Sequence, residues 1–126
     1  MDEPAPSVFR PNSISYLRIP APDASQLSAF YGAVFSWTLR ERPYGVSFTD
    51  GSGHVIGHFI PELAVAGEAG ARPYIFVESV DRTSALITAH GGTVVVEPYE
   101  EGDLWVACFR DPAGHVLGIW QLGPRG

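Results

Sequence analysis

Four histidines and one cysteine are the side chains of this sequence that are best suited to metal binding or nucleophilic chemistry. His54 and His58 lie four residues apart in one short apolar segment, and His115 follows a turn similar to the one before His54. On a strand, Cα atoms four residues apart are separated by roughly 13 Å, too far for two imidazoles to share an ion with bonds of about 2 Å. We therefore interpret the histidines as surface or structural residues, with His90 near the C-terminal end of a helix.

Cys108 alternates with Val106 and Arg110 in a predicted strand, which is typical of a small, buried apolar residue. Because it is the only cysteine of the chain, no disulfide can form within it, and this fits a reducing compartment. The sequence contains no glycine-rich phosphate loop, no Gly-x-Ser-x-Gly and no His-Glu-x-x-His. Common nucleotide, hydrolase and zinc-protease motifs are therefore absent from the sequence.

These residues are carried by a strand–helix–three-strand pattern that occurs twice along the chain. The predicted strands of the first unit are residues 14–20, 38–42, 46–49 and 54–60. Those of the second unit are residues 74–80, 93–97, 104–110 and 115–121. Asp23 and Asp81 are the expected N-caps of the two helices. The first helix should end near residues 35–37 and the second at Gly91.

An internal repeat links the two units. Residues 16–23 match residues 74–81, and residues 50–57 match residues 111–118. The aspartates that begin the second pair of segments can bond the backbone two residues on, and glycine closes each turn. We interpret them as turn-forming residues rather than catalytic acids. The repeat predicts an α+β fold of two tandem βαβββ modules.

The length of 126 residues favours a single domain. We expect residues 1–12 to form a flexible N-terminal arm and residues 13–126 to form one domain. Within that domain, residues 13–60 and 73–122 are the two modules, and residues 61–72, rich in alanine, glycine and glutamate, are the linker.

A net charge of −6 with only eight basic residues lacks the basic surface typical of a nucleic-acid-binding protein. No apolar run approaches about 18 residues, and no basic helix suggests binding to a membrane surface. The N-terminal segment has neither a basic region nor an apolar core of the kind found in signal peptides. We expect a cytoplasmic protein that binds neither nucleic acid nor membrane.

Three motifs resemble the vicinal-oxygen-chelate superfamily, which includes glyoxalases, bleomycin-resistance proteins and extradiol dioxygenases. They are Pro20-x-x-Asp23 before the first helix, Phe30-Tyr31 within it, and the turn of residues 111–114 before the last strand. The resemblance covers nearly all of residues 13–122. It implies two modules whose curved mixed sheets form half-barrels around one pocket. Metal-dependent members hold a divalent ion there through His, Gln or Glu from four strands.

In that family pattern, the metal ligands lie seven residues before each helix-capping aspartate and seven residues after each turn aspartate. These positions hold Tyr16, Gly57, Tyr74 and Gly118. Glycine offers no side-chain ligand, and a phenol with a pKa near 10 binds divalent transition metals poorly because deprotonating it is costly. The resemblance thus implies a member that lacks the metal ligands and needs no cofactor.

By the same resemblance, Tyr16 and Tyr74 face the pocket, and strand alternation adds residues that could stack on or orient a ligand. The predicted ligand-binding residues are Tyr16, Arg18, Phe59, Tyr74, Phe76 and Trp120. Aromatic walls suit a flat or hydrophobic molecule, Arg18 could meet an anionic group, and Gly57 and Gly118 would leave room. The sequence therefore predicts metal-independent binding of a small organic, aromatic or hydrophobic ligand between the modules.

Two alternative functions stay open at this point. One is a lyase, isomerase or dioxygenase with a divalent metal relocated to His54, His58 or His115, or a metal-free enzyme that uses a tyrosine as an acid. Another is an interaction module without a ligand, in which the aromatic residues fill an ordinary core. Analogy with the family, together with exposed sheet edges, also predicts a homodimer.

Overall fold

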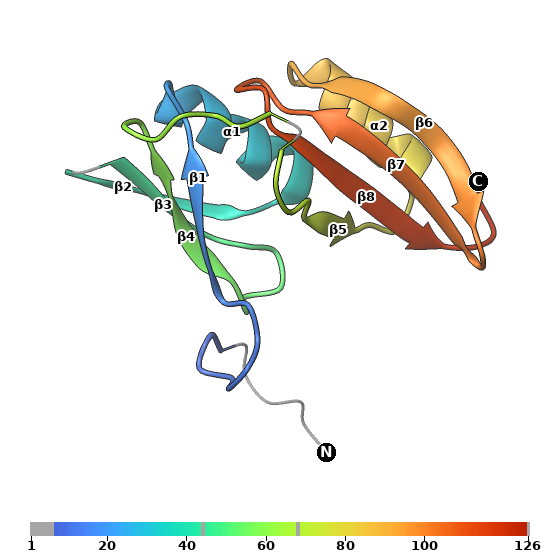
Figure 1. Ribbon diagram of the computed structural model, residues 1–126, viewed down its shortest axis with the longest axis horizontal. Coiled ribbons are helices and arrows are strands. Elements are labelled where there is room, and N and C mark those ends of the chain that lie inside the picture. The colour runs from blue at the N-terminus through green and yellow to red at the C-terminus, as the bar shows by residue number, and fades with distance from the viewer. Residues whose placement is uncertain (1–6, 44, 68, 126) are drawn as a thin grey trace. The chain divides into compact units, whose positions relative to one another are not determined.

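The computed structural model describes residues 7–43, 45–67 and 69–125 (Figure 1). The chain divides into two compact units, residues 1–64 and residues 65–126. Each unit contains one helix and one four-stranded mixed sheet, so the predicted α+β fold of two βαβββ modules is confirmed. Whether the two units form the single domain expected from the sequence stays a prediction. Neither helix of the described residues is long and apolar enough to cross a membrane.

In the first unit, β1 (Tyr16–Pro20) leads into α1 (Ala24–Phe35), followed by β2 (Thr38–Arg42), β3 (Gly45–Thr49) and β4 (Ile56–Ile60). The sheet order is β1-β4-β3-β2, with β1 parallel to β4 and the other pairs antiparallel. The side chain of Asp23 caps α1 as predicted, since it accepts a hydrogen bond of 3.0 Å from the backbone N–H of Gln26. Ser36 ends the helix in the left-handed conformation.

The core of the first unit is a group of aromatic rings between α1 and the sheet. Trp37 stacks between Tyr31 and Phe48, with ring centroids 4.6 and 4.7 Å away. Phe59 is only 1% exposed and contacts the rings of both Tyr31 and Phe48. The expected placement of Phe59 on a ligand-facing wall is therefore corrected, because its ring belongs to the helix side of the sheet.

In the second unit, β5 (Tyr74–Phe76) precedes α2 (Val80–Ala89), and β6 (Thr93–Glu101), β7 (Leu104–Arg110) and β8 (Val116–Leu122) follow. The order is β5-β8-β7-β6, with β5 parallel to β8, and α2 packs on one face of this sheet (Figure 1). Strand β6 contains two register shifts, and it ends four residues beyond its predicted end. Strand β5 ends four residues earlier than predicted.

Helix α2 is capped by Ser79, so the expectation that Asp81 would be its N-cap is wrong. The Ser79 hydroxyl accepts a hydrogen bond of 3.1 Å from the backbone N–H of Arg82. Asp81 lies in the first turn instead, where a carboxylate is favoured by the helix dipole, and it pairs with Arg125 at 2.9 Å. That hydrogen bond lowers the pKa of the Asp81 carboxyl group.

The two caps realign the internal repeat. Asp23 and Ser79 occupy the same place in the two units, so the offset at the first strand is 56 residues rather than the 58 expected from the sequence. Arg18, five residues before its cap, therefore corresponds to Tyr74. The residue that corresponds to Tyr16 is Arg72, which lies just before β5 in the predicted linker.

The last strand of each unit follows the same realignment. Arg18 pairs with His58 in the parallel ladder of the first sheet, and Tyr74 pairs with Gly118 in that of the second. His58 is therefore the counterpart of Gly118, and the expected correspondence between Gly57 and Gly118 is wrong by one residue. A slip of one residue turns every side chain of a strand to the other face of the sheet.

Gly57 faces the aromatic core, where a methyl group has no space. A Cβ at this position would lie 2.1 Å from the Leu17 carbonyl oxygen and 2.5 Å from the Phe48 ring. We expect Gly57→Ala to lower the free energy of unfolding by about 1–3 kcal/mol through overpacking, measured by urea denaturation. The control Gly51→Ala places its Cβ 3.4 Å from the nearest atom and should change stability by less than about 0.5 kcal/mol. Equal stability of both variants would contradict the register of β4.

Candidate functional site

The face of the first sheet opposite α1 carries Tyr16, Arg18 and His58, because residues paired between parallel strands point the same way. The Tyr16 hydroxyl and His58 Nδ1 lie 2.5 Å apart, within hydrogen-bond distance. Tyr16 is 47% exposed, and His58 is half-buried. We refer to this side of the sheet as the first open face, meaning the face that the helix of the same unit leaves uncovered.

A hollow of about 310 Å³ lies on the first open face. Its lining includes Tyr16, Thr38, Arg40, Arg42, Ser47, Thr49 and His58. The register places Arg40 beside Ser47 and Ser47 beside His58 across three adjacent strands. Neither arginine was predicted to lie in the site. The alternation of Thr38, Arg40 and Arg42 along one short strand was the signal that could have shown it.

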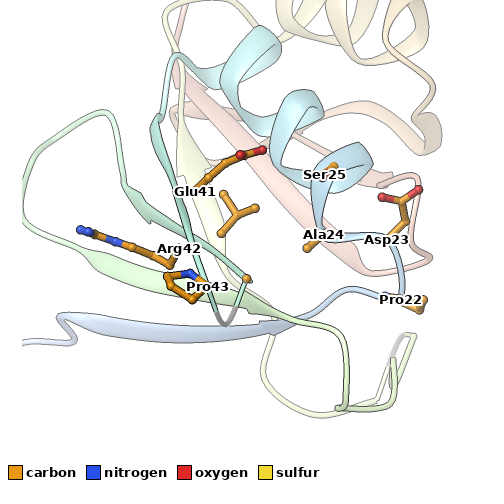
Figure 2. Close-up of a pocket in the computed structure, with 9 residues that line it drawn as sticks. Pro22, Asp23, Ala24, Ser25, Glu41, Arg42 and Pro43 are labelled. Atoms are coloured by element: carbon orange, nitrogen blue, oxygen red, sulfur yellow. The ribbon is translucent and has the colours of Figure 1, made fainter.

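A second hollow of the first unit, of about 490 Å³, lies between the N-terminal end of α1 and strands β2 and β3 (Figure 2). Figure 2 shows the Glu41 side chain pointing toward α1 and that of Arg42 pointing away from it. Asp23 also lines this hollow, and its carboxylate is already bonded to the helix backbone. Neighbouring residues of β2 thus point to opposite sides, and Arg42 belongs with Arg40 on the first open face.

The second sheet has its own open face, opposite α2, and this face is largely aromatic. Tyr74 and Phe76 are 44% and 53% exposed, and the ring of Phe76 meets that of Trp120 edge to face at 4.9 Å. Val96 and Tyr99 of β6 lie in the same two rows of the sheet and are also exposed. The structure therefore brings together the three predicted ligand-binding residues of the second module.

Gly118 does not leave a gap on the second open face. A Cβ at Gly118 would lie 2.1 Å from two carbons of the Tyr74 ring, so this ring lies directly over the glycine. The space that was predicted to hold a ligand is therefore occupied by Tyr74 itself. Gly57, the other expected gap, faces the core as described above.

Tyr74 forms a polar cluster with Arg72 and Cys108. The Cys108 thiol, which is buried, lies 3.6 Å from the Tyr74 hydroxyl and 3.6 Å from Arg72 Nη1. The hydrogen bond to Cys108 and burial raise the pKa of the Tyr74 phenol, and the hydrogen bond to Arg72 lowers it. The same contact with Tyr74 raises the pKa of the Arg72 guanidinium. The net effect keeps the phenol neutral, so it can act as a hydrogen-bond donor.

The residues at these positions do not fit a divalent metal site. The first open face offers one imidazole beside a phenol, and the second offers a phenol, a thiol and a guanidinium around a glycine. Across the described ranges, no group of three or more His, Cys, Asp or Glu side chains could hold an ion. His54 instead contacts the backbone carbonyl of Ser7 through Nδ1 at 3.0 Å. His90 is the exposed C-cap of α2.

Comparison with known proteins shows where this fold occurs. A family model described as "Glyoxalase-like domain" matches residues 16–119. The curated protein "Putative glyoxylase CFP32" of Mycobacterium tuberculosis (strain CDC 1551 / Oshkosh) is 28% identical over 128 aligned residues. That alignment covers 94% of this chain and 49% of CFP32, and the same holds for CFP32 of Mycobacterium bovis. The chain thus spans about half the length of the curated relatives it matches.

Two solved structures have the same fold. A glyoxalase/bleomycin resistance protein/dioxygenase family enzyme from Burkholderia phytofirmans PsJN has a TM-score of 0.73 at 21% identity, over 86% of this chain and 98% of that one. TnmS3, an antibiotic binding protein from Streptomyces sp. CB03234, has a TM-score of 0.70 at 16% identity, over 89% of this chain and 97% of that one.

The contacts of Tyr74 predict opposite effects of two substitutions on its titration. Cys108→Ala removes the largest cause that raises the pKa of Tyr74, so the pKa should fall. Arg72→Gln removes the hydrogen bond that lowers it, so the pKa should rise. The measurement is the pH dependence of the Tyr74 ring carbon signal in NMR spectra, with Leu122→Ala as a control that leaves it in place. Shifts of the same sign in both variants would refute the cluster.

Proposed function

Since this chain belongs to the glyoxalase-like domain family, within the vicinal-oxygen-chelate superfamily, we propose that it binds a small, flat organic ligand without the help of a metal ion. The observation that carries this proposal is the aromatic group of Tyr74, Phe76 and Trp120 on the second open face, in which Tyr74 and Phe76 are exposed and Trp120 is half-buried. The family resemblance implies that this face is the ligand-facing side of the module, which supports the proposal.

Exposed rings held in fixed positions favour stacking on a planar ligand. Phe76 and Trp120 already pack edge to face, and Tyr74 is fixed over Gly118 by its contact with Cys108. A further aromatic ring on such a surface gains about 0.5–1.5 kcal/mol per ring contact in addition to the burial of apolar area. TnmS3, an antibiotic binding protein of the same fold, supports the binding of a small organic molecule.

The donor set supports binding without a metal. After realignment on the helix caps, the positions that the family pattern gives to metal ligands hold a phenol and an imidazole, Tyr16 and His58, in the first unit. In the second unit they hold a guanidinium and a glycine, Arg72 and Gly118. Neither pair combines the imidazole and carboxylate ligands that divalent transition metals prefer. An enzyme with a metal relocated to His54, His58 or His115 stays the alternative, and it requires groups that the described residues do not bring together.

Tyr16 and Arg18 complete the proposed ligand-binding set from the first open face, where Arg18 would orient the ligand. The pocket between the modules, the homodimer and the cytoplasmic location stay predictions. Strand β6, an edge of its sheet with exposed Val95 and Val96, offers one edge at which two copies could pair.

The aromatic proposal predicts binding of a neutral planar probe such as 2-naphthol. Binding should quench the fluorescence of Trp120, because the probe stacks beside it. Phe76→Ala should weaken binding about two- to tenfold, the equivalent of one ring contact. Trp120→Phe should remove most of the fluorescence change while binding, followed by NMR, persists.

The matched control is Leu86→Ala, which removes an exposed apolar side chain from α2 rather than from the open face. This variant should bind the probe like the unchanged protein. Equal weakening by Phe76→Ala and Leu86→Ala would show that the probe binds apolar surface nonspecifically, and the aromatic site would be rejected.

The proposal that binding needs no metal ion can be tested separately. Protein purified without added ions should contain far less than one equivalent of Zn, Ni, Mn or Fe by elemental analysis. Dialysis against EDTA should leave the affinity for 2-naphthol unchanged. One equivalent of any of these metals, lost from the variant His58→Ala, would favour the relocated-metal enzyme instead.

A further inference from the structure

We propose that the first open face is an oxyanion site that takes the carboxylate or phosphate group of an organic ligand. It consists of Arg18, Arg40 and Arg42 with the hydroxyl groups of Tyr16 and Ser47. The inference rests on the proposed function and deepens it, since it names the chemical class of the ligand. This site lies wholly in the first unit, whereas the aromatic group lies wholly in the second.

The charge distribution supports an anion at this face. The chain carries 14 acidic and eight basic residues, yet three of its arginines project from one face of a single four-stranded sheet. Among the described residues of the four strands of that sheet, Glu41 is the only acidic one, and it points toward α1 (Figure 2). An acidic protein that gathers cations on one face, with no carboxylate from the same strands, creates a local positive potential suited to an anion.

The hydrogen-bond and ion-pair partners of these arginines also support an anion site. Within the parts of the chain that the structure describes, neither Arg18 nor Arg40 has a carboxylate within ion-pair distance. Arg125, by contrast, is bonded to Asp81 through two nitrogens. Arg42 donates from Nε to the Ser47 hydroxyl at 3.3 Å, which holds its guanidinium over the face. A planar guanidinium without a protein carboxylate presents paired N–H donors that match a carboxylate or phosphate.

The donors are also arranged to converge on one ligand group. Arg18, His58, Ser47 and Arg40 follow one another across the four strands in a single row. Adjacent strands are about 4.8 Å apart, so roughly 14 Å separates the two arginine Cα atoms. Three residues of this row, Arg40, Ser47 and His58, line the hollow of about 310 Å³, and Arg18 lies at the end of the row beyond it. Arg18 and Arg40 can therefore reach one small anion from opposite ends of the row. The Ser47 hydroxyl between them accepts from Arg42 Nε and donates to the Arg40 carbonyl, so it helps to hold the arginines in place.

The experiment is an NMR titration of the full chain with inorganic phosphate and, separately, with benzoate, at constant ionic strength set by chloride. Both oxyanions should shift backbone amide signals of β1, β2, β3 and β4. Neutral benzyl alcohol should not shift them. Arg40→Gln should weaken binding of the oxyanions about tenfold or more, because one charge-assisted donor pair is lost. The tighter of the two anions identifies whether the ligand group is a phosphate or a carboxylate.

The control variant is Arg82→Gln, which removes the same charge from the exposed surface of α2 and should leave the affinity unchanged. Arg40→Lys keeps the charge without the planar fork and should fall between Arg40→Gln and the unchanged protein. The inference is overturned if neither anion shifts the signals of the first sheet, or if Arg40→Gln and Arg82→Gln weaken binding equally. Quenching by neutral 2-naphthol should be unaffected by Arg40→Gln, so the two proposals can fail separately.

Discussion

The parallel pairing of the first and last strand of each unit is the constraint on which the rest of the structure depends. Because side chains alternate along a strand, pairing Arg18 with His58 sends Phe59 toward α1 and His58 to the open face. Pairing Tyr74 with Gly118 places a ring directly over a residue without a side chain. A shift of one residue in either ladder would exchange core and surface.

Much of the fold could be predicted from the sequence because its local signals agree with one another. The apolar stripe of α1, its Asp23 cap and the turns that begin at Asp50 and Asp111 were sufficient to define two modules. The register could not be predicted, because the two turns close differently. The N–H of Asp50 bonds to the carbonyl of Val55, five residues on, whereas that of Asp111 bonds to His115, four residues on. The first turn therefore contains one more residue than the second, and the similarity of the two turn sequences gives no sign of it.

The candidate site was predictable only in part, for the same reason. Tyr74, Phe76 and Trp120 were expected together, and the structure places them on one face, because alternation within a strand depends on no long-range contact. The roles of His58 and Arg72 depend on which residue caps a helix and on the register of a distant strand. Ser79 and Asp81 are both good N-caps, so sequence alone could not choose between them.

The realigned repeat shows that the two units differ at residues that face away from their helices. Arg18 corresponds to Tyr74, His58 to Gly118, and Ser47 to Cys108. A metal ion held by ligands from both units needs a suitable donor at each ligand position. Such divergence would therefore destroy its site. The first open face offers guanidinium groups and the second offers aromatic rings. If each face binds through its own chemistry, the equivalent positions of the two units need not carry similar side chains. The two open faces therefore suit different chemical groups, an anion on the first and a flat apolar group on the second.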